Sequence, residues 1–354
     1  VDAKMPQWID QCQRRQCYFG PDLSVGEVAM FSALKSSFSG GVDAKMPVAP
    51  PPNPNTGPST GPSTATLVAD SRHTRHVIGG WELEGVSIAG QETCIIVPRA
   101  KVVFDIGRCP QRAVFQQTVL ITHGHLDHIG GAHFHVTSRQ LAGLPPSKLV
   151  VPEAYVDNLK QFVDVANSLQ GSPPIDYMVL GLKVGQELQL ASGFIVRPFP
   201  TVHPVASQGY LLYSVRKKLR ADLVGKSQEE IKALRLAGHD VQEVHQIPEI
   251  AFTGDTTAAF LQQPGLEDVL SARLLIMELT FLDESVSVEE ARERGHMHII
   301  DFAANAHLFD KIDTILLIHF SSRYKRHEIL SHLNTWLPPA LRARCVPWLN
   351  GFPE

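Results

Sequence analysis

Short apolar runs, separated by polar or glycine-rich segments, recur along the chain from residue 77 onward. Runs of four to eight such residues, rich in Val and Ile, are typical of strands. They predict strands at residues 81–88, 93–97, 101–108, 115–122, 149–152, 194–199, 249–253, 273–277 and 314–318. Apolar residues at helical spacing predict helices at 153–169, 228–237, 257–260 onward, 288–294 and 325–333. Strands predominate in this alternation, which predicts an α/β fold with two mixed sheets packed face to face and helices on the outer faces.

The first 76 residues do not follow this pattern. Residues 50–66 consist mostly of Pro, Gly, Ser, Thr and Asn, which bury too little apolar surface to form a core. We therefore expect residues 1–76 to be a disordered or low-complexity extension and residues 77–354 to form the folded domain. Residues 1–47 carry as many acidic as basic groups, whereas an organelle transit peptide is usually acid-poor. We favour a disordered extension, or a true start at Met46, over a transit peptide.

The overall composition limits the possible classes of protein. Of the 354 residues, 44% are hydrophobic and 19% charged, which is ordinary for a soluble globular protein, and no run approaches the ~18 apolar residues of a membrane span. Five scattered cysteines indicate a reducing compartment rather than a disulfide framework. The net charge is −4, so any surface that binds nucleic acid must be a local basic patch.

Three histidines and an aspartate follow the strand predicted at 115–122, in the order His123, His125, Asp127, His128. Imidazole and carboxylate groups are the ligands that zinc-like divalent metals prefer. Their close spacing prevents all of them from reaching one ion without strain, so they divide naturally between two neighbouring ions. The alternative is a polar turn that happens to be rich in histidine.

Four more of the predicted strands end at or just before a residue that can bind metal or transfer protons. These residues are His203, Asp255, Glu278 and His319. A single histidine after a strand is usually structural, but a whole set at strand ends predicts a site along one edge of a sheet.

The stretch from His123 to His128 resembles the His-x-His-x-Asp-His signature of the metallo-β-lactamase superfamily. Together with further motifs, it makes the region from Val77 to Phe352 similar to the tRNase Z branch, and in particular to its short plant-type form. The further motifs are FDIGRCPQR at 104–112, HPVASQGY at 203–210, FTGDTT at 252–257, GHMH at 295–298 and HFSSRY at 319–324.

The resemblance implies a metallo-β-lactamase αβ/βα sandwich that holds two zinc ions per chain. His123, His125 and His203 match the ligands of the first zinc. Asp127, His128 and His319 match those of the second, and Asp255 matches the carboxylate that bridges both ions. No ligand is missing, which argues against a binding protein that has lost its activity.

Such a pair of ions provides a hydroxide nucleophile near neutral pH for attack on a phosphodiester. The leaving ribose oxygen is a poor leaving group and needs a general acid. Glu278 and His296 resemble the acid pair of the family, with His298 as the rival histidine. Asp127 is expected to be both a ligand and the proton acceptor for the attacking water. Asp105 either orients a ligand histidine through its second ring nitrogen or is a simple turn residue.

Several residues are candidates for binding the substrate. The resemblance implies such a role for Ser207 and Tyr210. Arg323 either contacts a phosphate or forms a structural ion pair. A dense basic run lies at 215–236, where seven basic and three acidic residues give a local net charge of +4. Its leading members are Arg216, Lys217, Lys218 and Arg220. In the family an arm inserted here, at about 214–247, grips tRNA; the alternative is a basic helix exposed to solvent.

These expectations favour a zinc-dependent endoribonuclease that removes the 3′ trailer from precursor tRNA and leaves a 3′-hydroxyl. The alternative is a small-molecule metallohydrolase of the same fold, either a phosphodiesterase or a glyoxalase II-like thioesterase. A non-catalytic RNA-binding protein is a third and less favoured possibility. We expect a homodimer without membrane association, located in the cytoplasm or nucleus, or in the chloroplast if residues 1–66 are a transit peptide.

Overall fold

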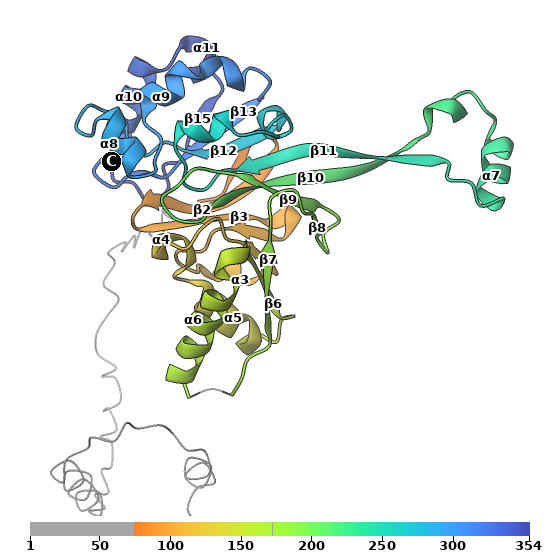
Figure 1. The fold of residues 1–354 in the computed structure, drawn as a ribbon, viewed down its shortest axis with the longest axis horizontal. Helices are drawn as coiled ribbons and strands as arrows, with labels where there is room; N and C mark the ends of the chain where they lie inside the picture. Colours follow the sequence, from red (N-terminus) through yellow and green to blue (C-terminus); the bar gives the residue numbers. More distant parts are fainter. Residues whose placement is uncertain (1–73, 172) are drawn as a thin grey trace, which may run out of the picture. The chain divides into compact units, whose positions relative to one another are not determined.

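The computed structural model describes residues 74–171 and 173–354, so nearly all of the predicted extension lies outside the described residues (Figure 1). The first sheet has the strand order β1-β2-β3-β4-β5-β6-β7, with β14 beside β2. Its parallel part runs from β4 to β7. The bounds are β1 (His76–Ile78), β2 (Trp81–Ala89), β3 (Glu92–Val97), β4 (Val102–Phe104), β5 (Thr118–Leu120), β6 (Ser147–Pro152), β7 (Tyr177–Leu182) and β14 (Phe320–Ser321).

The second sheet has the order β15-β13-β12-β11-β10-β9-β8. Strands β11, β12, β13 and β15 run parallel, and β8 to β11 pair antiparallel. The bounds are β8 (Leu188–Gln189), β9 (Ile195–Pro200), β10 (Gln208–Leu219), β11 (Gln242–Phe252), β12 (Leu274–Glu278), β13 (Thr314–Ile318) and β15 (Cys345–Pro347). Both sheets are therefore mixed, as the sequence predicts.

Helices cover the outer face of each sheet (Figure 1). On the first sheet lie α3 (Gln111–Val114), α5 (Ala132–Leu141) and α6 (Val156–Leu169). Near the second lie α8 (Val288–Glu293), α9 (Ile299–Ala304), α10 (Arg326–Trp336) and α11 (Pro339–Arg342). The remaining helices are α4 (Leu126–Ile129) and α7 (Gln228–Leu236). None of the described helices combines the length and the apolar character needed to cross a bilayer.

Strand β12 shows how alternation builds the core. Leu274 and Ile276 face the cluster between the two sheets, whereas Leu275 and Met277 face the cluster under the outer helices. Because both faces are buried, the strand reads as a continuous apolar run. Between the sheets, the rings of Phe104 and Phe252 stack with their centroids 4.7 Å apart.

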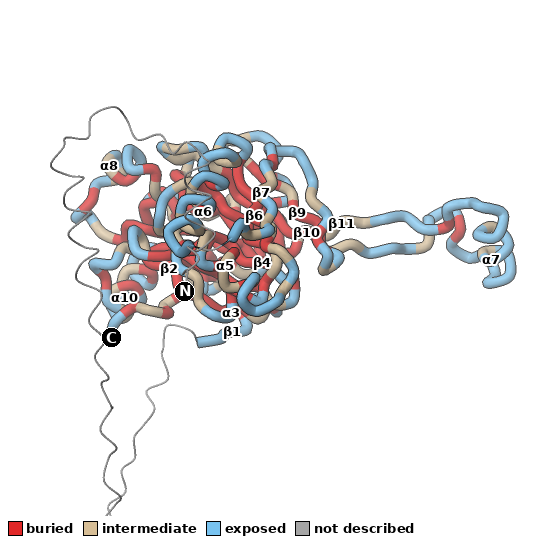
Figure 2. The backbone as a smooth tube through the Cα atoms, turned by 90° about the horizontal axis from the view of Figure 1, so that it is seen from below, coloured by how far each residue is buried: buried red, intermediate tan, exposed pale blue. Residues whose placement is uncertain are grey.

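An arm leaves the body of the protein at the far ends of β10 and β11 (Figure 1). The two strands pair antiparallel from Tyr210–Phe252 out to Leu219–Gln242. At the tip, α7 begins with a capping box in which Ser227 accepts a hydrogen bond from the Glu230 backbone and the Glu230 side chain accepts one from Ser227. Helix α7 has no buried residue, and most of the arm is exposed (Figure 2).

The predicted elements are present, but some of their bounds are wrong. The strands predicted at 101–108 and 115–122 reduce to β4 and β5, because the buried Ile106 and Ile121 belong to loops that form the site. The helix predicted from Thr257 is a short 3-10 turn, Ala258–Gln262. Helix α5 was not predicted as a distinct element, because two histidines interrupt its apolar stripe.

Candidate metal centre

The metal-ligand candidates lie at the carboxyl ends of strands from both sheets. His123 and His125 follow β5, His203 follows β9 and Asp255 follows β11. His319 links β13 of the second sheet to β14, which pairs with β2 of the first. The prediction of one sheet edge is therefore corrected: the residues meet where the edges of the two stacked sheets come together.

Close backbone packing holds the loop that carries the motif. His125 is the N-cap of α4, which places Asp127 and His128 on its first turn. A Cβ at Gly107 would lie 1.9 Å from the carbonyl oxygen of Asp127, so only glycine allows the two segments to approach this closely.

The donor atoms of the predicted ligands fall into two groups, and His296 forms a third cluster of potential donors with Asp255 and His319. In the first, the His125 Nδ1 lies 3.1 Å from the His123 Nε2 and 3.2 Å from the His203 Nε2. In the second, the Nε2 atoms of His128 and His319 are 3.3 Å apart. Each of these two nitrogens lies 3.6 Å from the Asp127 Oδ2.

Asp255 lies between the groups. Its Oδ2 is 3.7 Å from the His123 Nε2 and 3.4 Å from the His128 Nε2, and its Oδ1 is 3.4 Å from the His319 Nε2. The Oδ1 is buried and accepts no hydrogen bond from any described residue. A buried carboxylate oxygen without a donor is costly unless a cation lies beside it.

The two groups fit metal ions. Donor atoms about 2.1 Å from one tetrahedral ion lie roughly 3.4 Å apart, which is close to the separations in each group. Burial lowers the pKa of His123 well below its usual value and also lowers that of His203, so both rings are neutral, the form that binds metal. Although burial opposes ionisation, His319 and His128 hold the pKa of Asp127 well below its usual range.

The ring nitrogens that point away from the centre are held by hydrogen bonds. The Nδ1 of His128 contacts the Asp105 Oδ2 at 2.8 Å, which favours the first of the two alternatives for Asp105, a residue that orients a ligand histidine. The Nδ1 of His319 lies 3.1 Å from the Thr280 Oγ1. Asp105 also accepts hydrogen bonds from the amide and hydroxyl of Thr122. Such contacts fix the orientation of each ligand ring.

Glu278 and His296 form a pair beside the ligands. The His296 Nδ1 lies 3.1 Å from the Glu278 Oε1. Glu278 is fully buried and accepts further hydrogen bonds from the Thr256 and Met297 amides and the Thr280 hydroxyl. Burial opposes charge on His296, but the Glu278 carboxylate outweighs it and raises the pKa of His296 to about 9. The carboxylate therefore favours the protonated form of the ring.

The rival histidine has a different role. The Nδ1 of His298 accepts a hydrogen bond from the Ile300 amide, which makes His298 the N-cap of α9, and its Nε2 contacts the Asp283 carbonyl. Both ring nitrogens are therefore engaged away from the ligands. The geometry favours His296 as the acid.

The predicted role of Tyr210 in binding the substrate is wrong. Tyr210 is fully buried in the cluster between the sheets, and its hydroxyl donates to the carbonyl of Ile121. Because the side chain is enclosed, it cannot reach a substrate. Its hydrogen bond to Ile121 instead supports the loop that leads to His123.

The other two predicted substrate-binding residues outside the arm lie nearer the surface. Ser207 is half-buried, with its hydroxyl 2.7 Å from that of Thr201. Arg323 is exposed and donates to the hydroxyls of Ser285 and Ser321.

The basic residues of the arm differ in their surroundings. Arg216, Lys217 and Lys218 are exposed on β10. Arg220 is exposed too, but its guanidinium forms an ion pair with Asp222 at 3.0 Å. Three of the four predicted cations therefore carry their charge free of an ion pair within the described part of the chain.

Thr122 and Gly295 have roles that the sequence motifs do not predict. The Thr122 hydroxyl lies 3.0 Å from the His123 Nδ1, and the Gly295 carbonyl lies 2.9 Å from the His203 Nδ1. Thr122 directly precedes a ligand, which is a usable signal. Gly295 is 92 residues from His203, so nothing in the sequence connects them.

Gly295→Ala should displace His203. The glycine has φ +82°, and an added Cβ would lie 2.1 Å from the Pro204 Cδ and 2.6 Å from the His203 Nδ1. We expect metal affinity to fall about 10- to 100-fold, as on loss of a group that orients a ligand. Competition with a chelator measures this. Gly265→Ala is the matched control, since Gly265 has φ +79° with open space around its Cβ position. Equal affinities in both variants would contradict the positioning role.

Comparison with known proteins agrees with this geometry. Residues 108–320 match the family model described as a beta-lactamase superfamily domain. The tRNase Z TRZ1 of Arabidopsis thaliana is 42% identical over 275 residues, which cover 78% of this chain and 97% of the relative. The chain belongs to the tRNase Z family.

The motif resemblance and the metallo-β-lactamase fold are thereby confirmed. The chloroplastic tRNase Z TRZ2 of Arabidopsis thaliana is also 42% identical, over 272 residues that cover 77% of this chain and 76% of the relative. A nuclear ribonuclease Z of Triticum aestivum is 42% identical over 164 residues, covering 46% of this chain and 93% of the relative. Members of the tRNase Z family that resemble this chain thus carry the names of two different compartments.

Proposed function

We propose that this protein is a metal-dependent endoribonuclease that removes the 3′ trailer from precursor tRNA and leaves a 3′-hydroxyl. The observation that carries this proposal is the Glu278–His296 pair beside a complete set of metal ligands. A pair of this kind is needed only when the leaving group is poor, as a ribose oxygen is. The names of the tRNase Z relatives support the same substrate.

Zinc ions held by the two ligand groups would polarise the phosphate and activate water. The chain supplies the proton transfers. Asp127 is ionised and accepts a proton from the attacking water. His296 uses its Nδ1 to contact Glu278, which leaves Nε2 as the atom that donates a proton to the leaving oxygen. Glu278 is held by two backbone amides, so it keeps the ring oriented.

We propose two zinc ions per chain, because seven ligand side chains exceed the set that one tetrahedral ion uses. Metal analysis of the protein, purified without chelator, should give two ions per chain. One tightly bound ion, with all seven side chains intact, would contradict the paired site.

The alternative is a small-molecule hydrolase of the same fold. A thioester has a good thiolate leaving group and needs neither an acid pair nor a basic arm. The two functions are separated by comparing kcat/KM for a labelled precursor tRNA and for a glutathione thioester, each with zinc and with a chelator. Efficient thioester hydrolysis without RNA cleavage would favour the alternative.

The exposed cations of the arm are proposed to bind the tRNA body. Changing Arg216, Lys217 and Lys218 to Ala should weaken precursor-tRNA binding by at least about tenfold. Because each lost phosphate contact removes about 0.7 to 0.9 from the salt slope, the plot of log affinity against log salt should flatten by roughly 2 to 3. Binding titrations at several salt concentrations measure both effects.

The control for this variant removes the same charge elsewhere. Lys148, Lys160 and Lys311 lie on the body of the protein, and their replacement by Ala changes the net charge equally. If the arm grips the substrate, this control keeps a steep salt dependence. Identical losses in both triple variants would mean that general charge, and not the arm, attracts the RNA.

We also propose that the protein is a homodimer. Large apolar side chains are exposed on α5, among them Phe134 and Leu141. Symmetric association would cover such a surface. Light scattering should give the mass of two chains, and a monomer at all concentrations would contradict this.

We also propose that the protein is located in the cytoplasm or the nucleus, with the chloroplast as the alternative. The location of a fluorescent fusion of the full chain decides between them.

A further inference from the structure

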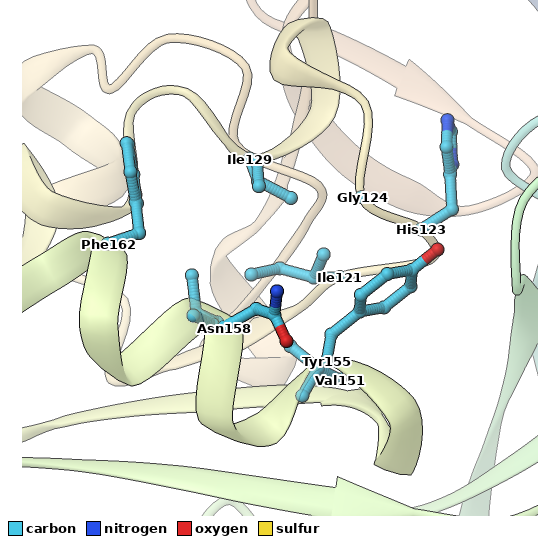
Figure 3. Close-up of a pocket in the computed structure, with 9 residues that line it drawn as sticks. Ile121, His123, Gly124, Ile129, Val151, Tyr155, Asn158 and Phe162 are labelled. Carbon is cyan, nitrogen blue, oxygen red and sulfur yellow. The ribbon is translucent and has the colours of Figure 1, made fainter.

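A cavity of about 250 Å³ lies directly beside the metal ligands (Figure 3). His123 and Gly124 form one wall of it, and α6 with the turn before it forms the other. The volume is just below the ~300–1,000 Å³ range of sites for drug-sized ligands. A single small planar group is therefore a suitable occupant.

Two aromatic rings face this cavity from opposite ends (Figure 3). Tyr155 and Phe162 are seven residues apart and thus on one face of the helical segment. The sequence predicts that their stripe packs in the core. This holds for Leu159 and Val163, which are buried, but Tyr155 and Phe162 remain half-buried and line the cavity. Both rings pack on one side against the core cluster under the helices that cover the first sheet, where the Phe162 centroid lies 5.5 Å from that of His133, and each keeps part of its surface toward the cavity.

A polar group lies between the rings. The Asn158 amide points into the cavity, with Ile121 and Val151 nearby (Figure 3). Asn158 is exposed, and its side chain has no hydrogen bond to a described residue, so its oxygen and its two N–H groups are available. Apart from His123, no lining residue is ionisable near neutral pH. The cavity suits a neutral planar group with polar edges rather than a phosphate.

Tyr155 connects the cavity to the catalytic loops. A Cβ at Gly124 would lie 3.0 Å from the Tyr155 Cε1, so the ring packs against the loop between His123 and His125. The Tyr155 hydroxyl lies near the backbone of Gly124 and of Ala206, in the loop that follows His203. A group bound in the cavity would therefore be adjacent to the ligands of the first metal group.

We propose that this cavity receives one unpaired nucleobase of the RNA strand next to the scissile phosphodiester, stacked on Phe162 and hydrogen-bonded to Asn158, with Tyr155 closing the opposite end. This proposal rests on the proposed function, which makes a single-stranded RNA end the substrate. Proteins commonly bind unpaired bases by stacking on aromatic rings and by hydrogen bonds to the base edges. The base belongs either to the last retained nucleotide or to the first trailer nucleotide, and the test distinguishes the two.

The test combines protein variants with abasic substrates. Phe162→Ala should lower kcat/KM for precursor tRNA about 5- to 100-fold relative to an aryl phosphodiester, the range expected for one lost stacking contact. For the wild type, an abasic site at one of the two positions should cause a similar loss. In the Phe162→Ala variant, the same abasic site should lower kcat/KM little further, because the base no longer has the Phe162 ring to stack on. Asn158→Ala should reduce the preference among the four bases at the same position.

Two further variants keep the result interpretable. Gln161→Ala changes an exposed residue of α6 outside the cavity and should behave as the wild type on all substrates. If Phe162→Ala loses its bound metal or its circular dichroism signal, Phe162→Leu removes the ring while retaining apolar volume, and it should give the same pattern.

The outcomes separate this proposal from the proposed function. A wild type that cleaves no precursor tRNA, yet hydrolyses the aryl phosphodiester, refutes the proposed function and this inference with it. A wild type that cleaves precursor tRNA, with additive effects of Phe162→Leu and both abasic sites, refutes the cavity proposal alone.

Discussion

His296→Ala should slow precursor-tRNA cleavage by about 10²- to 10⁴-fold, the usual contribution of a general acid. Hydrolysis of an activated aryl phosphodiester should fall far less, because its leaving group departs without a proton. The reason is the contact of His296 with the buried Glu278, whose charge favours the protonated ring. Single-turnover rates on the two substrates measure the difference, with bound metal quantified in the same samples.

Two matched variants test the assignment further. Glu278→Gln keeps the size of the side chain but removes the charge that holds the proton, so it should also affect RNA more than the aryl substrate. His298→Asn changes the neighbouring histidine to another residue that caps helices well, and it should retain RNA cleavage. Equal losses on both substrates in His296→Ala would mean that His296 supports the metal ligands instead.

Asp105→Ala should weaken metal binding about 10- to 100-fold, although Asp105 is not itself a proposed ligand. The substitution removes the acceptor of the His128 Nδ1 and leaves the Thr122 amide without its partner. The buried donors would lose their hydrogen bonds, which adds about 1–3 kcal/mol of destabilisation for each. Chelator competition and thermal unfolding of the metal-loaded protein measure the two effects.

Asp105→Asn provides a graded comparison. Asp105 has φ +54°, a conformation that Asn tolerates better than Ala. The Asn oxygen can still accept a hydrogen bond from His128, so the metal affinity of Asp105→Asn should lie between those of the wild type and Asp105→Ala. If Ala and Asn bind metal as tightly as the wild type, the orientation of His128 does not depend on Asp105.

Much of the metal centre could be predicted because its signal is local. The residues from His123 to His128 lie within one loop and one turn of helix, and the remaining ligands follow apolar strands directly. The strands themselves are buried on both faces, as β12 shows, and therefore stand out as continuous apolar runs. Local chemistry and strand pattern were sufficient for these features.

Other features depend on contacts between distant segments. Tyr210 follows a motif histidine closely in sequence, yet its strand turns it into the core. The role of Gly295 depends on a contact with His203 that only the folded chain creates. Similarly, the aromatic stripe of α6 has the spacing of a core-facing helix, and only the packing of α6 against the metal loop leaves the cavity open. The spacing of residues within one helix does not show whether a cavity remains between that helix and a neighbouring loop.

The central claim is tested most directly with a precursor tRNA that carries separate labels in its body and its 3′ trailer. The protein is freed of metal, incubated with this RNA with and without added zinc, and both products are mapped and their ends analysed. We predict one zinc-dependent cut that releases the intact trailer and leaves a 3′-hydroxyl on the tRNA. No cleavage of the RNA by the zinc-loaded protein, while a thioester or another small substrate is hydrolysed, would contradict it.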